Sequence, residues 1–413
     1  MRAGEMVAAD RTSPAVTAAF ARRGAHGVLA LLQERGGPIV EASGNPDSRL
    51  VTFVFSDETA AARTPAVVCP ALPNKSILLR RLGASTVFVA TAEVPAGSLV
   101  GYSYVVEPPP ALLAGEDGGF VEAFAIGRPD PFKPLKDAVS LPQIRFEYEY
   151  SVLALDGTYA EHANATTATP QGAFDEWIVS SRLLGNDRAV RVYRPASDHA
   201  TAAARTLVVV LGAAEEWWPA GASLDSLAAR ASEPFLGVLV GTRGFVSRHR
   251  ELAGNDTFVA FARHELLPFL SARYHVRESG HVVAGASVGG VGAAFLALRD
   301  PDAFSRAAVV SGTFQATPAG SPLPWKSVVG RERPVLDAYE RHAGRFPARA
   351  YVSVGRFETY RRVDMHADGS RLASILARRG VDVRFDDGYT AHDTIALRRY
   401  LSTGLAWLLG ADG

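Results

Sequence analysis

The chain has 413 residues, of which 47% are hydrophobic and 21% charged, an ordinary composition for a globular protein with room for two or three domains. Basic and acidic residues balance at 43 each, so no overall field favours nucleic acid or an anionic membrane as a partner. The single cysteine, Cys69, excludes an internal disulfide framework and a cysteine-rich metal site, and its apolar neighbours predict a core position. The sequence shows neither a membrane-spanning apolar run nor the apolar core of a secretory signal, so we expect a cytoplasmic protein.

The first 155 residues change from a helical to a strand pattern. Apolar residues at helical spacing over 12–35 predict one or two helices, with Ser13-Pro14 as the start signal and Gly36-Gly37 as the stop signal. These helices form a predicted N-terminal segment, residues 1–36. Over 37–155 the hydrophobic period becomes two, in short β-rich runs divided by Gly, Pro, Asp and Asn. These runs predict a small antiparallel β-sandwich domain. Residues 156–176, rich in Thr, Ala, Gly and Pro, predict a surface linker.

Strand and helix patterns alternate from residue 177 to residue 413. The predicted strands are WIVSSRLL, AVRVYRP, TLVVVLG, FLGVLVG, HVVAGAS, RAAVVSG, RAYVSVG and VDVRFDD. Helices are predicted between them over 223–231, 256–272, 291–298 and 369–379. Alternation of this kind predicts the α/β class, a mostly parallel sheet covered by helices. The expected architecture is an α/β-hydrolase domain preceded by the β-sandwich.

A short pattern in residues 281–299, HVVAGASVGGVGAAFLALR, carries the chemistry. An apolar run meets Gly285-Ala286-Ser287-Val288-Gly289 and then a helical pattern, which matches the G-x-S-x-G nucleophile elbow. Such a turn presents Ser287 at the end of a strand, above a helix N-terminus that can stabilise an oxyanion. A glycine-rich packing turn would give the same five residues. A dinucleotide loop is disfavoured because the spacing G-x-G-x-x-G is absent.

Most of the chain resembles the enterochelin (ferric enterobactin) esterases. The catalytic half carries this resemblance in Leu184-Gly185-Asn186-Asp187-Arg188, Arg248-His249-Arg250-Glu251-Leu252, the elbow itself, Ser311-Gly312-Thr313-Phe314, Gly355-Arg356-Phe357-Glu358 and Ala391-His392-Asp393. The first half is similar to that family's companion β-domain through Gly37-Pro38-Ile39-Val40-Glu41, Val51-Thr52-Phe53 and Asp130-Pro131. The resemblance implies a cytoplasmic serine esterase that opens a tris-catecholate trilactone siderophore, with Ser287 as nucleophile and His392 as base. The chain departs from the family pattern at 211–217, at Thr390-Ala391 and at Leu397.

A serine nucleophile needs an imidazole that takes its proton and returns it to the leaving alcohol. The order Ser, acid, His of this fold leaves His342, His366 and His392 downstream of Ser287. His392 follows the last predicted strand, in a loop position suited to catalysis. His366 is the second choice, and His342 has the surroundings of a solvated helix residue.

The third member of a triad should be a carboxylate in the loop after the preceding strand. Glu358 lies three residues past Gly355 and is the first choice, with Asp364 as the alternative acid. A Ser-His dyad without an acid stays open, as does a purely structural ion pair between Glu358 and Arg361 or Arg362.

The remaining candidates concern oxyanion and substrate binding. The oxyanion donors are predicted to be the N–H of Val288 and one from the loop after 207–211, at Gly212 or Ala213. The predicted substrate-binding side chains are Arg248 and Arg250, for catecholate or carboxylate oxygens, and Trp217, for aromatic groups. Arg250 and Glu251 could equally be solvated surface residues. Trp218 and Trp325 have core packing as the simpler explanation.

The leading hypothesis is a serine carboxylic ester hydrolase that cleaves a siderophore or related cyclic depsipeptide. No metal-ligand spacing such as H-E-x-x-H is present, so we expect no metal site and no cofactor, and any iron arrives with the substrate. The expected partner is a small-molecule ester such as a ferric siderophore, with neither nucleic acid nor membrane. The alternatives are a hydrolase or acyltransferase of a natural-product pathway, and a non-catalytic binding protein on the same fold. The oligomeric state is left open.

Overall fold

The computed structural model describes residues 12–57, 64–114, 117–134, 136–141, 146–155, 157, 169–196, 203–212, 218–317, 332–360 and 363–411. The chain divides into two compact units. The first unit consists of Met1–Tyr159, Tyr360–Arg362 and Gly388–Ala396, and the second contains the rest of the chain. Two short segments within the predicted catalytic domain, residues 177–413, therefore group with the first unit.

The helix α1 (Pro14–Arg35) opens the first unit. The Ser13 side chain caps it by accepting from the Val16 N–H at 3.0 Å, and Gly36 ends it in the left-handed conformation with φ 67°. Its backbone departs from helical geometry at Arg23 and Gly24, so two helical stretches meet there at a kink, in agreement with the predicted one or two helices. In the described part of the predicted segment 1–36, α1 packs into a core that it shares with strands of the first unit. That core contains Val16, Ala19, Val28, Leu32, Ile39, Val54, Val87 and Val89.

Two antiparallel sheets form the body of the first unit, as predicted. One sheet has the order β1 (Ile39–Ala42), β2 (Ser48–Ser56), β6 (Val87–Pro95), β5 (Arg80–Arg81). The other has the order β4 (Ser76–Leu78), β3 (Ala66–Val68), β7 (Leu99–Val105), β9 (Phe146–Ala154), β8 (Lys136–Leu141). The unit also contains η1 (Pro73–Lys75), α2 (Pro110–Leu113) and α3 (Asp117–Ile126).

The two sheets face each other across an aromatic core. The rings of Phe53 in β2 and Tyr102 in β7 lie 5.3 Å apart, and the Tyr104 hydroxyl accepts from the Val54 N–H at 3.1 Å. Cys69 is buried, as predicted, and burial raises the pKa of its thiol to about 12. The packing confirms the β-sandwich prediction.

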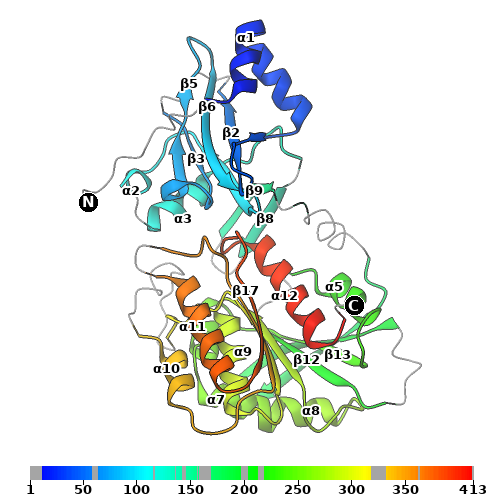
Figure 1. The fold of residues 1–413 in the computed structure, drawn as a ribbon. Helices are drawn as coiled ribbons and strands as arrows, with labels where there is room; N and C mark the ends of the chain where they lie inside the picture. The colour runs from blue at the N-terminus through cyan, green and yellow to red at the C-terminus, as the bar shows by residue number, and fades with distance from the viewer. Residues whose placement is uncertain are drawn as a thin grey trace. The chain divides into compact units, whose positions relative to one another are not determined.

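An eight-stranded sheet forms the centre of the second unit (Figure 1). Its strands, in spatial order, are β10 (Ala173–Ser181), β11 (Asn186–Arg194), β13 (Phe235–Val240), β12 (Thr206–Leu211), β14 (Val282–Ala286), β15 (Arg306–Val310), β16 (Arg349–Ser353) and β17 (Asp382–Asp386). Pairing is antiparallel from β10 to β13 and parallel from β13 to β17. All eight predicted strands are present. β10 begins at Ala173, inside the predicted linker, because it pairs with β11 as far as Arg194.

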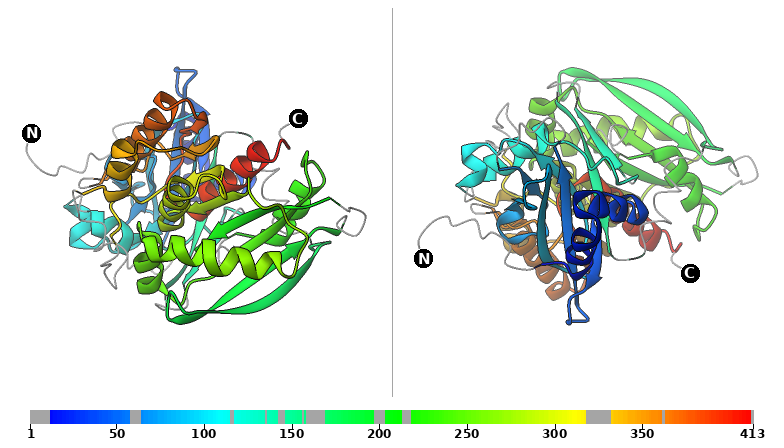
Figure 2. Two further views of the ribbon diagram at one scale, coloured as in Figure 1. Left: turned by 90° about the horizontal axis from the view of Figure 1, so that it is seen from below. Right: turned by 90° about the horizontal axis from the view of Figure 1, so that it is seen from above.

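Helices cover both faces of this sheet (Figures 1 and 2). They are α5 (Ala220–Ala228), α6 (Phe245–Leu252), α7 (Asp256–Phe261), the π-helical turn η5 (Ala262–Leu266), α8 (Leu267–Ser271), α9 (Val288–Arg299), α10 (Pro334–Arg341), α11 (Met365–Arg378) and α12 (Thr394–Leu408). The four predicted helices correspond to α5, to α7 with η5 and α8, to α9, and to α11. In the described part of the chain no helix is long and apolar enough to cross a membrane.

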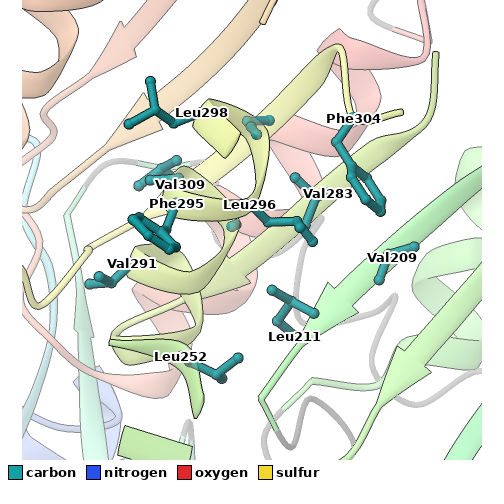
Figure 3. Packing of buried hydrophobic residues seen from close by; sticks show 14 of the residues in the cluster. Val209, Leu211, Leu252, Val283, Val291, Phe295, Leu296, Leu298, Phe304 and Val309 are labelled. Atoms are coloured by element: carbon teal, nitrogen blue, oxygen red, sulfur yellow. The ribbon is translucent and has the colours of Figure 1, made fainter. Parts of the chain in front are cut away.

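Alternating strand residues separate the two faces. On one face Val209, Val283 and Val309 pack in a buried cluster with Val291 and Phe295 of α9 (Figure 3). On the other face α12 and α5 approach the sheet closely. A Cβ at Gly404 of α12 would lie 2.4 Å from the Tyr351 ring, and one at Gly237 of β13 would lie 2.6 Å from Leu224 of α5. The sheet is thus buried on both sides, which explains its continuous apolar runs.

His281 is a buried histidine just before β14. It is 1% exposed, and its Nδ1 accepts from the Leu207 N–H at 3.2 Å. Burial, with the nearby charges of Arg306 and Arg277, lowers the pKa of His281 to about 4. The unfolded chain therefore binds a proton between about pH 6.5 and pH 4 that the folded chain does not.

We expect the free energy of unfolding to fall as the pH is lowered through this window, by on the order of 2 kcal/mol from His281 alone. Denaturant unfolding at pH 7 and pH 4.5 measures the loss. The variant His281→Gln, which cannot take up this proton, should show a smaller loss between the two pH values. An identical loss in both proteins would contradict the assignment.

Candidate active site

Ser287 lies on a tight bend between β14 and α9. Its backbone has φ 58° and ψ −125°, a conformation that non-glycine residues rarely adopt. The flanking glycines are required by space. A Cβ at Gly285 would lie 2.3 Å from the Gly289 carbonyl oxygen, and one at Gly289 would lie 2.5 Å from the Leu211 carbonyl oxygen. The strained strand-turn-helix geometry predicted for G-x-S-x-G is therefore present.

The turn after β15, residues 311–313, contacts both Ser287 and Glu358. The Thr313 Oγ1 lies 3.1 Å from the Ser287 Oγ, and the Ser311 hydroxyl donates to the Glu358 Oε1 at 2.7 Å. Ser311 has φ 45° and is fully buried. In the sequence this turn stands out only as part of the family resemblance, and no role is predicted for it. The turn was missed because Ser and Thr after a strand are common, and only the fold brings them to Ser287 and Glu358.

Glu358 is the better placed of the two candidate acids. Its carboxylate is fully buried, and Oε1 also accepts from the Gly355 N–H at 2.7 Å. Asp364 is exposed and caps α11 by accepting from the Ala367 N–H at 2.9 Å, so its side chain has a structural role. Arg361 and Arg362, the alternative partners of Glu358, lie outside the described residues. The structure therefore favours Glu358 over Asp364.

His392 belongs to the segment Gly388–Ala396 of the first unit. Within that unit the segment is bonded on both sides of the histidine. The Leu99 N–H donates to the Tyr389 carbonyl at 3.0 Å, the Gly101 N–H donates to the Asp393 Oδ2 at 3.1 Å, and the Thr394 hydroxyl donates to the Asp137 Oδ2 at 2.6 Å. Ser287 and Glu358 thus share the second unit, whereas the loop that carries His392 is fixed by bonds within the first.

His366 and His342 have other partners. The His366 Nε2 lies 3.1 Å from the Asp387 Oδ2, and the Arg356 Nε donates to the same oxygen at 3.1 Å. Burial alone would raise the pKa of Asp387, but the hydrogen bonds from His366 and Arg356 outweigh it and lower that pKa. His342 follows α10, and its Nε2 lies 3.0 Å from the Arg345 carbonyl oxygen. His366 has a carboxylate that could orient it, so it remains the second candidate base.

The two predicted oxyanion donors differ in their surroundings. Val288 opens α9, where the first N–H groups of a helix have no acceptor within the helix. Gly212 has φ 83°, and its N–H donates to the Val240 carbonyl at 3.3 Å, so it would have to give up that bond to bind an oxyanion. Ala213 and Trp217 lie outside the described residues.

Arg248 contacts the elbow from α6. Its Nη2 donates to the carbonyl of Ala286, the residue before Ser287, at 3.1 Å, and its Nε lies 3.0 Å from where a Cβ of Gly212 would be. The substrate-binding prediction did not include this contact, which predicts a positioning role for Arg248. Arg250, on the same helix, is exposed.

The burial of Glu251 and Trp218 decides two further predictions. Glu251 is 5% exposed and forms a buried ion pair with Arg188, with Oε1 2.7 Å from Nη2, so its interpretation as a solvated surface residue is wrong. This pair joins two segments of the family resemblance, around Arg188 and around Glu251. Trp218 is buried, as its core interpretation predicted, and Trp325 lies outside the described residues.

Among the described residues, no group of three or more His, Cys, Asp or Glu could hold a metal ion.

The contact between Arg248 and Ala286 predicts that substitution of Arg248 lowers kcat whether or not the substrate is charged. We expect Arg248→Met to lower kcat roughly tenfold on a neutral and an anionic aryl ester alike, because the bend at Ser287 loses a charged hydrogen-bond donor. Steady-state kinetics on the two esters measure this. Arg250→Met is the comparison and should leave the neutral ester unaffected. A loss in Arg248→Met that is confined to the anionic ester would show a substrate-binding role instead.

Comparisons with known proteins agree with this architecture. No curated protein matches the sequence. A ferric enterobactin esterase from Salmonella typhimurium has the same fold, with 20% identity and a TM-score of 0.73 over 92% of this chain and 98% of that chain. An enterobactin esterase from Shigella flexneri, determined in the presence of enterobactin, is 20% identical with a TM-score of 0.71 over 92% and 97% of the two chains. These matches confirm the predicted fold class.

The family model described as "Putative esterase" matches residues 180–408, from the end of β10 to the end of α12. The matched range contains the elbow, the turn after β15 and the loops of Glu358 and His392. Because this model covers more than half of the sequence, the chain belongs to that esterase family.

Proposed function

We propose that this protein is a serine esterase that opens ester bonds of a siderophore, such as an enterobactin-like catecholate trilactone or a related cyclic depsipeptide, through an acyl-enzyme on Ser287. The observation that carries the proposal is the strained bend at Ser287, held between two glycines that tolerate no Cβ. A buried carboxylate, Glu358, is bonded to the same turn that contacts the Ser287 hydroxyl.

The proposed reaction has two steps. Ser287 Oγ attacks the ester carbonyl while its proton passes to the imidazole of His392, and the imidazolium then returns that proton to the leaving alkoxide. In the second step water attacks the acyl carbon by the same route and releases Ser287. The Val288 N–H, with a second donor from the loop after β12, stabilises the oxyanion, and Glu358 orients the imidazole and stabilises its cation.

The substrate class rests on the resemblance and on the shared fold. Solved structures of this fold include enterobactin esterases determined with enterobactin and with 2,3-dihydroxy-N-benzoyl-serine. An esterase of this kind would act in the cytoplasm on a ferric siderophore, with the iron carried by the substrate. The departure of 211–217 from the family pattern favours a second candidate, a hydrolase or acyltransferase of a natural-product pathway.

Ser287→Ala tests the nucleophile. We expect turnover of a simple aryl ester and of a catecholate trilactone to fall by at least about a thousandfold, since no acyl-enzyme can form. A fluorophosphonate probe should label the wild-type protein at Ser287, identified by peptide mass, and leave the variant unlabelled. Undiminished turnover in folded Ser287→Ala would end the proposal. Failure of the probe to label the wild type would favour a non-catalytic binding protein.

The histidine variants separate the two candidate bases. We expect His392→Ala to lower kcat roughly a thousandfold and His366→Ala to leave it within a few-fold, because only the first removes the proposed proton acceptor. Both variants are compared by kcat on the aryl ester and by thermal melting. The opposite pattern would assign the base to His366, which Asp387 would orient.

Product analysis separates the two candidate functions. Incubation with a panel of ferric and iron-free siderophores, followed by mass spectrometry, should show products whose summed mass exceeds that of the parent ester by one water for each bond cleaved. Acyl products formed with an added alcohol or amine in preference to water would support the acyltransferase.

A further inference from the structure

Thr313 is a buried residue whose hydroxyl contacts the proposed nucleophile from the turn after β15. It is 5% exposed, and its Oγ1 lies 3.1 Å from the Ser287 Oγ. Backbone hydrogen bonds also join Thr313 to Ser287 and to Ala316. The Thr313 N–H donates to the Ser287 carbonyl at 3.3 Å, and the Thr313 carbonyl accepts from the Ala316 N–H at 2.9 Å. In return, the Ser287 N–H donates to the carbonyl of Val310, at the end of β15, at 2.9 Å. The two hydroxyls are therefore held together by the backbones that carry them.

The direction of the hydroxyl–hydroxyl bond follows from a count of protons. Either oxygen could donate in the resting protein. A serine hydroxyl has a single proton, and in the reactive state that proton must point to the base. Ser287 Oγ can then only accept from its neighbour, so the Thr313 hydroxyl must be the donor.

We propose that Thr313 is a further catalytic residue, whose hydroxyl donates a hydrogen bond to Ser287 Oγ and stabilises the negative charge that this oxygen gains during the reaction. The inference rests on the proposed function, because it takes Ser287 as the nucleophile. In acylation the bond from Oγ to the acyl carbon forms as the Ser287 O–H bond breaks and its proton passes to the imidazole. Thr313 keeps its own proton throughout.

The effect of Thr313 is largest in deacylation. Water adds to the acyl carbon and gives a proton to the imidazole, and the carbon–Oγ bond then breaks with its electron pair moving to Oγ. Oγ is the leaving group in this step, and it holds most negative charge just before the imidazolium protonates it. A hydrogen bond to a charged acceptor is worth more than one to a neutral hydroxyl, so the Thr313 donor lowers this barrier more than that of acylation.

The surroundings of Thr313 suit a preorganised donor. Its β-branched side chain has restricted rotation, and its turn begins at Ser311, which is fully buried, has φ 45° and is bonded to Glu358. A donor that is already in place at the reacting oxygen costs no reorganisation during the reaction. The turn after β15 thus serves the nucleophile through Thr313 and the acid through Ser311.

Thr313→Val removes the hydroxyl with little change of shape, and Thr313→Ser keeps it. The matched control is Thr52→Val in the first unit, where the hydroxyls of Thr52 and Thr91 form another buried pair 2.9 Å apart. Pre-steady-state kinetics on an aryl ester measure the acylation rate from the burst and the deacylation rate from the steady state. Thermal melting reports folding, and fluorophosphonate labelling reports Ser287. If Thr313→Val does not fold, Thr313→Ala takes its place.

We expect Thr313→Val to lower the deacylation rate about tenfold or more and the acylation rate less, so that the acyl-enzyme accumulates. Thr313→Ser should stay near wild type, and Thr52→Val should change the melting temperature without changing the ratio of the two rates. The inference would be overturned by unchanged acylation and deacylation rates in a folded variant without the hydroxyl, by equal decreases in both rates, or by no recovery of the deacylation rate in Thr313→Ser. In each case, fluorophosphonate labelling of Ser287 would still support the proposed function. Full turnover by Ser287→Ala would overturn both.

Discussion

The approach of α9 to the central strands is the constraint on which the rest of the site depends. β14 runs into α9 with one residue, Ser287, at the bend, and the helix lies so close to the sheet that neither flanking position has room for a Cβ. The bend holds Ser287 at a positive φ, which costs of order 1–3 kcal/mol for a non-glycine residue. The packing of the surrounding core offsets this free-energy cost. α9 is buried along nearly its whole length, with Val291 and Phe295 in the main apolar cluster (Figure 3).

The parallel pairing of neighbouring strands explains why residues far apart in the sequence meet. β14, β15 and β16 lie side by side, and the carboxyl ends of parallel strands share one edge of a sheet. Ser287 follows the first of these strands, Ser311 the second and Glu358 the third. β15 lies between the other two, so its turn contacts the residues that follow both neighbours. The turn therefore connects the proposed nucleophile to the proposed acid, although no motif marks it.

The first unit includes a short segment from near the end of the sequence. Residues Gly388–Ala396, which follow β17 in the sequence, are bonded to β7 and β8 of that unit through a backbone bridge and the side chains of Asp393 and Thr394. Tyr150 of β9 adds a hydroxyl contact to Thr394 at 2.6 Å. The conformation of the loop that carries His392 thus depends on a sandwich folded from the other end of the chain. Under the proposed function, loss of the sandwich would impair the base itself.

The sequence by itself determined the strands of the α/β domain, four of its helical regions and the fold class of this protein. Period-two and continuous apolar runs identified the eight strands of the α/β domain, and the glycine spacing identified the bend at Ser287, because these signals are local and each reflects burial or steric limits of a single segment. Only the tertiary structure decided which side chains meet. In the folded chain Arg248 donates to the carbonyl of Ala286, and Asp364 caps a helix. Glu251 is buried in an ion pair with Arg188, and the Thr313 hydroxyl contacts that of Ser287. Such contacts depend on strand order and helix packing, and a single sequence contains no local signal for either.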